Sequence, residues 1–191
     1  MHYDRERVVR RMRKWEDYLR EHALPSWEAL PALELYMDQV VALLNSYLGF
    51  LPKEVGMDAV VTAAAVNNYV RKKIIPPPVK KRYSRVHLAC LLMICSLKHS
   101  VNISYIQQMI PPTLTEAEIR DIYNAFVAQH RRTTLYFVEQ VNRQASQILA
   151  EGESDDAGVS NIATAFAVVS GLSRMATEKL ILMQEPTDNK E

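Results

Sequence analysis

The sequence predicts an all-α protein with at most one short hairpin. Only five glycines occur among the 191 residues, too few for the many tight turns of an all-β fold. Hydrophobic residues recur at steps of three and four along most of the chain, which is the spacing of amphipathic helices. A hydrophobic content of 48% is sufficient for a folded core.

The two cysteines, Cys90 and Cys95, lie in one apolar run without a nearby metal-binding partner, so we expect reduced, buried packing residues. The N-terminus is dense in both charges and has no apolar centre, which argues against a secretory signal. The longest weakly polar run, 157–172, falls short of a membrane span. We therefore expect a cytoplasmic protein with no membrane partner.

Residues 1–30 are predicted to contain one amphipathic helix, Asp4 to Ala23, which ends before Pro25. Its apolar stripe is Val8, Met12, Trp15 and Leu19. The arginines of this helix allow a nucleic-acid arm as an alternative. Because acidic residues interleave with them, we favour a face exposed to solvent.

Residues 31–112 are predicted to form a compact helical domain. A helix runs from Pro31 to about Leu48, and Thr62 is a good N-cap for a helix over 63–72. The prolines at 76–78 form a stiff extended spacer, and Ser84 caps the next helix. A capping-box pattern at Ser104 predicts a short helix through Ile110.

Residues 113–186 are predicted to form a C-terminal helical region, and 187–191 a disordered tail. A long helix begins at Thr115 and runs to about Glu151. The polar block 129–134 indicates either a bend or a turn that faces water, and we favour the second. An acidic loop over 151–156 precedes a last helix, 161–183. The apolar stripe of this region fits a partner subunit and packing within the chain equally well.

Charge distinguishes one stretch of the chain from the rest. Between Ala59 and Thr115 there are eight lysines and arginines and no acidic residue, while the other parts carry 15 basic and 22 acidic residues. The overall net charge of +1 conceals this segregation. A segregated basic patch attracts polyanions such as nucleic acids, although a solvated basic turn on a helical bundle is the alternative.

No enzyme signature is present in the sequence. It lacks a glycine-rich phosphate loop, a Gly-x-Ser-x-Gly elbow and a His-Glu-x-x-His pair. The five histidines are scattered, and a cluster of His99 with His130 is the remaining candidate for catalysis. We therefore expect no catalytic residue, no metal and no cofactor.

The basic stretch has four parts in a fixed order: Val66, Asn67, Asn68 and Tyr69, then a turn from Ile74 to Pro77, then Tyr83, and then an apolar helix with Leu88, Leu91, Ile94 and Leu97. This order resembles the winged helix-turn-helix module of MerR-type bacterial regulators. The pattern of that family is Leu-Arg-Tyr-Tyr, a short polar stretch, a Gly-Leu-Leu-x-Pro turn, a wing that ends in tyrosine, and a periodic apolar helix. The chain is also similar to a bacterial family of unknown function that carries such a module after a Leu-Tyr-Met-Asp-Gln helix, here 35–39.

This resemblance implies a regulator that binds double-stranded DNA. The helix 62–72 would enter the major groove, and the basic wing 76–83 would grip the neighbouring backbone. The residues expected to contact DNA are Thr62, Asn67, Asn68, Arg71, Lys72, Lys80, Lys81, Arg82, Tyr83 and Arg85. Asn67 and Asn68 replace the arginine and tyrosine of that family, and asparagine can pair with an adenine edge. Lys73 replaces a glycine, which predicts a turn of different shape.

The resemblance also implies two further partners. DNA readers of this kind bind as dimers, so we expect a homodimer formed through the C-terminal helices. MerR-type proteins carry an effector domain, which implies a small-molecule effector of unknown identity. The candidates for its pocket are Phe126, Tyr136, Phe137, Phe166 and Met175. A helical interaction protein whose basic face meets an acidic protein partner is the alternative.

Overall fold

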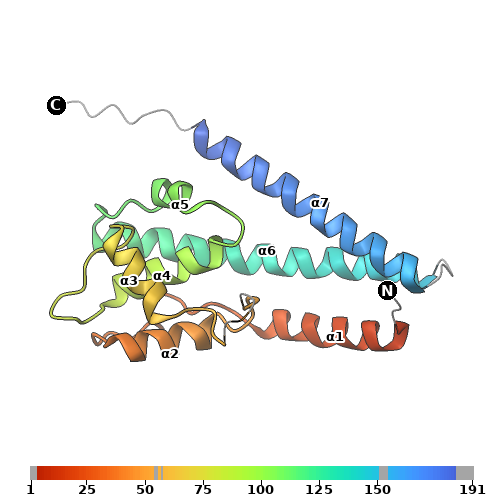
Figure 1. The fold of residues 1–191 in the computed structure, drawn as a ribbon, viewed down its shortest axis with the longest axis horizontal. Helices are drawn as coiled ribbons and strands as arrows, with labels where there is room; N and C mark the ends of the chain where they lie inside the picture. Colours follow the sequence, from red (N-terminus) through yellow and green to blue (C-terminus); the bar gives the residue numbers. More distant parts are fainter. Residues whose placement is uncertain (1–3, 54–55, 57, 151–154, 184–191) are drawn as a thin grey trace.

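The computed structural model describes residues 4–53, 56, 58–150 and 155–183, and these residues form seven helices and no strand. Figure 1 shows an elongated molecule in which the long helix α6 runs through the middle, between α5 and α7 on one side and α1 and α2 on the other. In chain order the helices are α1 (Arg5–Glu21), α2 (Met37–Tyr47), α3 (Ala63–Arg71), α4 (Arg85–Leu97), α5 (Ile103–Met109), α6 (Glu116–Ala150) and α7 (Asp155–Leu182). The all-α prediction is confirmed.

Three helix starts differ from the sequence prediction. Helix α7 begins at Asp155 and not at Asn161, so the end of the predicted acidic loop is helical. Helix α2 begins at Met37 and not at Pro31, because Leu35 pairs with Tyr83: each backbone N–H donates to the other residue's carbonyl, at 2.9 and 2.8 Å. Helix α5 is capped by Asn102 and not by Ser104, since Asn102 Oδ1 accepts from the Ser104 N–H at 3.1 Å. The predicted acidic loop 151–156 and the tail 187–191 lie largely or wholly outside the described residues.

Helix α4 lies at the centre of the core. Every residue from His87 to Cys95 is buried, and α2, α3 and α6 pack around them with Leu44, Tyr69 and Tyr123. Each fully buried leucine stabilises such a core by roughly 1.5–3 kcal/mol. Cys90 and Cys95 are free and buried here, as predicted.

The segment that connects α1 to α2 is tied to α6. The Tyr123 hydroxyl donates to the Pro25 carbonyl at 2.9 Å, and the Trp27 N–H donates to Asn124 Oδ1 at 3.2 Å. Trp27 is itself buried against Tyr123, with ring centroids 6.3 Å apart. Residues before α2 therefore contribute to the same core as the helices that follow.

Helix α1 packs along α6 through the predicted polar block. Arg131 Nη1 donates to the carbonyls of Leu19 and His22 at 3.4 and 3.1 Å. His130 is half-buried between the rings of Phe50 and Phe126, with centroids 5.4 and 5.9 Å away. Helix α6 continues through this block without a break, but only part of the block faces water.

Helix α7 contacts α6 near its start and α5 near its end (Figure 1). Phe166 packs on Phe137 at a centroid distance of 5.5 Å, and Ile181 is buried in the core. Of the residues expected to line an effector pocket, Tyr136 and Met175 are exposed to solvent, whereas Phe137 and Phe166 pack on each other. No helix in the described part of the chain combines the length and apolarity needed to cross a bilayer.

Candidate nucleic-acid interface

Helix α3 presents one side to the core and the other to solvent. The hydroxyl of Thr62 accepts from the Ala65 N–H at 3.2 Å, so Thr62 is the N-cap, as predicted. Val66 and Tyr69 are buried, which fixes the rotation of the helix. Asn67 is exposed on the opposite side, together with the small side chains of the first turn.

Two of the predicted contact residues bind each other on this exposed side. Arg71 Nη2 donates to Asn68 Oδ1 at 2.9 Å, and Asn68 is half-buried. This bond holds the Arg71 guanidinium along the helix, near the exposed Lys72. Asn67, Asn68, Arg71 and Lys72 therefore form one continuous polar and basic strip.

The start of α3 is held by Asn45, a residue that the sequence analysis did not single out. Asn45 Oδ1 accepts from the Val60 and Val61 N–H groups at 2.8 and 3.1 Å. Asn45 Nδ2 donates to the Val61 carbonyl and to the Val41 carbonyl, both at 2.8 Å. One side chain on α2 thus positions the chain that enters α3. An asparagine on a helix gives no sequence signal for this role.

Lys73 ends α3 with a φ of 55°. The Ile74 N–H donates to the Tyr69 carbonyl at 2.9 Å and the Lys73 N–H to the Val70 carbonyl at 3.0 Å, which are the two bonds of a Schellman motif. The turn therefore keeps the shape that glycine favours. The prediction that lysine would change its shape was wrong, because lysine itself adopts the left-handed conformation.

The wing is a two-residue hairpin. Val79 and Arg82 form an antiparallel bridge, and the Arg82 N–H donates to the Val79 carbonyl at 2.9 Å. Lys80 and Lys81 occupy its tip with φ values of 50° and 63°. Positive φ at both central residues is the pattern of a type I′ turn, which strongly favours Asn-Gly. The chain from α3 to α4 projects at one end of the molecule (Figure 1).

Two of the predicted contact residues, Tyr83 and Arg85, pack against the core and not toward solvent. Tyr83 is only 3% exposed and packs on His87, so its ring has no surface to offer a ligand. Arg85 donates to the Leu30 carbonyl at 3.0 Å and stacks over Trp27 at 5.6 Å. Both side chains are engaged inside the protein because they join the wing to the core. The sequence pattern could not separate them from the exposed cations.

His87 fixes the turn into α4. Its Nδ1 accepts from the Ser84 N–H at 3.0 Å. Burial lowers the pKa of His87, whereas the carbonyls of Pro77 and Pro76 and the charge of Glu34 act in the opposite direction. We infer a neutral ring at pH 7 that anchors the base of the wing.

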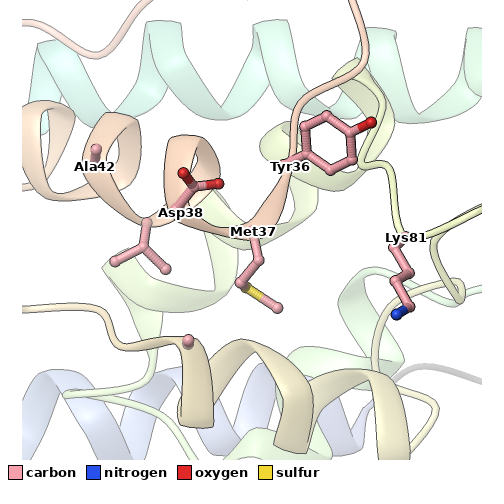
Figure 2. Close-up of a pocket in the computed structure, with 7 residues that line it drawn as sticks. Tyr36, Met37, Asp38, Ala42 and Lys81 are labelled. Carbon is pink, nitrogen blue, oxygen red and sulfur yellow. The ribbon is translucent and has the colours of Figure 1, made fainter.

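A cavity of about 630 Å³, largely open to solvent, lies between α2, α3 and the hairpin (Figure 2). Met37 projects into it from α2, Ala63 lines it from the first turn of α3, and Lys81 reaches toward it from the hairpin tip. Asn67 is one helical turn beyond Ala63 on the same side of α3. The cavity therefore connects the exposed side of α3 with the wing.

Most cations of this surface have no carboxylate partner. Lys72, Lys73, Lys80 and Lys81 are exposed, and no acidic residue within the described ranges forms an ion pair with them. Arg82 stacks over the Tyr36 ring at 5.2 Å, which the sequence analysis did not foresee. Asp38 also lines the cavity, and the charge of Glu34 acts on His87 at the base of the wing. Exposed cations without a carboxylate partner are available to an anionic ligand.

Fold and site together define an all-α protein whose basic helix–turn–hairpin unit is presented by a buried central helix. The chain belongs to the family described as "Domain of unknown function (DUF1836)", which matches residues 25–126. This confirms the predicted membership in a family of unknown function. Neither the curated proteins nor the solved structures gave a match. The matched range covers α2 to α5 and the first part of α6, so it includes the whole basic unit.

Proposed function

We propose that this protein is a MerR-like transcription regulator that binds double-stranded DNA. Helix α3 enters the major groove, where Asn67 and Asn68 contact base edges and Arg71 and Lys72 contact phosphates. Lys80, Lys81 and Arg82 of the hairpin hold the adjacent backbone. Phosphate contacts position such a module, and base contacts provide its specificity.

One observation carries this proposal: Lys73, Lys80 and Lys81 all have a left-handed backbone. A side chain in that region costs roughly 1 kcal/mol per residue, and glycine or asparagine avoids most of this cost. The chain places lysine at all three positions, which lie at the two ends of the α3–hairpin connection. Backbone strain of this kind is concentrated at functional sites. A need for three positive charges in binding a polyanion explains why lysine occupies these strained positions.

The accessibility of α3 supports the same proposal. Its exposed side begins with the small residues Ala63 and Ala64, which allow close approach to a groove, and continues with Asn67. The hairpin tip stands beside this side across the cavity (Figure 2). An α-helix fits the major groove of B-DNA, and a neighbouring basic element then lies against phosphates.

The test is a pair of double variants. Lys80→Asn with Lys81→Gly places the preferred Asn-Gly pair in the type I′ turn, so the fold becomes more stable while two charges are lost. Lys14→Gln with Lys53→Gly removes two exposed lysines outside the basic segment and is the matched control. We expect the hairpin variant to bind duplex DNA at least tenfold more weakly, and the control to bind within about twofold of the wild type.

Fluorescence anisotropy with a pool of labelled duplexes measures this difference, and thermal melts establish that both variants are folded. Equal loss of affinity in the two variants would mean that only net charge matters. Undiminished binding by a folded hairpin variant would exclude the wing as a DNA contact.

The cavity favours a second candidate function. Its walls include the apolar side chains of Met37, Val41 and Ala42, which a DNA backbone does not require. A helical interaction protein would use this cavity for an apolar side chain of an acidic partner, with Lys81 pairing to a carboxylate. Met37→Glu discriminates the two: it blocks the cavity, and it abolishes binding of an acidic peptide while duplex binding falls only modestly.

A further inference from the structure

The cavity between α2, α3 and the hairpin is apolar, although it lies within the basic surface. The surface that lines it is almost entirely carbon, with Met37 and Val41 from α2 and Ala63 from α3. Asp38 also borders the cavity, but Figure 2 shows its carboxylate directed away from Met37. Burying a polar group against such a lining is unfavourable, whereas burying an apolar group is favourable. The cavity therefore fits a ligand that brings an exposed apolar group.

Cations stand at the hairpin side of this cavity. Lys81 lines it directly, and Lys80 precedes Lys81 at the hairpin tip. The Arg82 guanidinium stacks over the ring of Tyr36, another lining residue, at 5.2 Å from the ring centroid. Both lysines are exposed and form no ion pair within the part of the chain that the structure describes. A ligand that fits here carries negative charge beside its apolar group.

Duplex DNA combines these two properties in its major groove. Its phosphates are anionic, and the C5 methyl group of thymine is the apolar group that its base pairs present there. Ala63 is exposed and belongs both to the cavity and to the first turn of the helix proposed to enter the groove. A base edge that meets this turn therefore lies next to the cavity, with Lys81 on the side of the phosphates.

A G·C pair fits this place less well than an A·T pair. Cytosine presents an amino group in the major groove, and the carbon lining leaves such a donor unpaired. Asn67 lies one turn beyond Ala63 on the same exposed side, and an asparagine amide pairs with N6 and N7 of adenine. The cavity and Asn67 thus both favour A·T pairs.

We infer that this cavity recognises thymine: Met37 and Ala63 contact its C5 methyl group, and the protein prefers A·T pairs at this place in its binding site. The inference rests on the proposed binding of DNA by α3. It adds Met37 as a residue that determines specificity, although Met37 lies on α2, outside the helix and the wing expected to contact DNA. Burying one methyl group corresponds to a gain in affinity of about fourfold.

Thymine and uracil duplexes test the inference, because they differ only in the C5 methyl group. The probes are DNA duplexes of alternating A·T pairs, of alternating A·U pairs and of alternating G·C pairs, at low salt concentration. We expect the full wild-type chain to bind the thymine duplex at least threefold more tightly than the uracil duplex, and the G·C duplex more weakly than either. Fluorescence anisotropy of the labelled duplexes measures the three affinities.

Two variants assign the methyl contact to the cavity. Met37→Ala removes the side chain that projects into it, and Ala63→Ser replaces an exposed methyl group with a hydroxyl that can bond to any base. We expect the ratio of thymine to uracil affinity to fall toward one in both variants, with little change in affinity for the uracil duplex. Leu33→Ala is the matched control and should keep the wild-type ratio, because Leu33 is 80% exposed and does not line the cavity.

The possible failures are distinguishable. Equal wild-type affinity for the thymine and uracil duplexes, or a preference for the G·C duplex, would overturn the inference and leave the proposed DNA binding intact. A wild type that binds none of the three duplexes would contradict the proposed function and the inference with it. A thymine preference that survives in both folded cavity variants would also overturn the inference. The wild-type comparison needs no substitution, so it decides even where Met37→Ala does not fold.

Discussion

Helices α4 and α7 are both rich in apolar residues, yet they have opposite environments. From His87 to Cys95, α4 is buried on every side by its own chain. Helix α7 is covered on one side only and leaves six large hydrophobic side chains exposed to solvent: Val168, Val169, Leu172, Met175, Leu180 and Leu182. Both helices are nearly free of charge in their apolar stretches. Hydrophobic content alone therefore does not show whether a helix is buried by its own chain.

What separates the two helices is the number of elements that contact them. Helix α4 is surrounded by α2, α3, α5 and α6, while α7 meets α6 and α5 near its ends. Helix α4 also carries the base of the wing through His87 and the neighbouring Tyr83. Helix α4 therefore provides stability and positions the basic surface, whereas α7 contributes less to the core of the chain.

The largest expected effect is in α4. Leu92→Ala removes a fully buried side chain and should lower the free energy of unfolding by about 2–5 kcal/mol. Leu172→Ala, the same substitution in α7, should change it by less than about 0.5 kcal/mol when the protein is dilute. Urea denaturation measures both variants. Similar losses at the two positions would show that α7 is part of the monomer core.

The second comparison sets a hydrogen-bonded asparagine, Asn45 on α2, against an exposed one, Asn161 on α7. Asn45→Ala leaves the N–H groups of Val60 and Val61 and the Val61 carbonyl without their partner, and should cost roughly 2–4 kcal/mol. Asn161→Ala on the exposed surface of α7 should cost less than about 0.5 kcal/mol. Asn45→Ala should also weaken DNA binding, since the start of α3 loses its position. Unchanged stability in that variant would contradict the bonding described for Asn45.

The smallest expected effect depends on pH. Burial, together with the charge of His22, lowers the pKa of His130. A histidine with a lowered pKa is neutral in the folded state, so stability is full above the unfolded pKa of about 6.5 and falls as pH decreases below it. His130→Phe keeps an aromatic ring between Phe50 and Phe126 and removes the titration.

The measurement is the free energy of unfolding at neutral and at mildly acidic pH. We expect the wild type to lose more stability on acidification than His130→Phe. The pKa of His87 is also lowered, so His87 makes the same contribution to the loss of stability in both proteins. That contribution cancels when the two losses are compared. An equal loss in the two proteins would contradict a neutral buried His130.

Much of the fold could be predicted because local signals agree with the tertiary structure. The N-cap at Thr62, the stop before the prolines and the apolar spacing of α4 all act within a few residues of the chain. Residues 31–36 could not be predicted in the same way. Their non-helical backbone depends on the pairing of Leu35 with Tyr83, nearly fifty positions later, and long-range pairing leaves no local pattern.

The basic site was only partly predictable for a similar reason. Charge segregation identified the exposed lysines, but burial separates Lys81 from Tyr83 and Arg85 within the same stretch. Sequence does not reveal which of several adjacent side chains turns inward. The positive φ angles of Lys73, Lys80 and Lys81 could not be predicted from sequence either. Only the backbone geometry shows that these lysines occupy positions suited to glycine or asparagine.

The measurement that tests the central claim most directly is the salt dependence of duplex DNA binding. Each phosphate contact contributes about 0.9 to the slope of log K against log salt concentration. The triple variant Lys73→Gly, Lys80→Asn, Lys81→Gly should therefore be as stable as the wild type or more so, with a slope smaller by about 3. A stable triple variant with the wild-type slope, or a wild type that does not bind duplex DNA at low salt, would contradict the account.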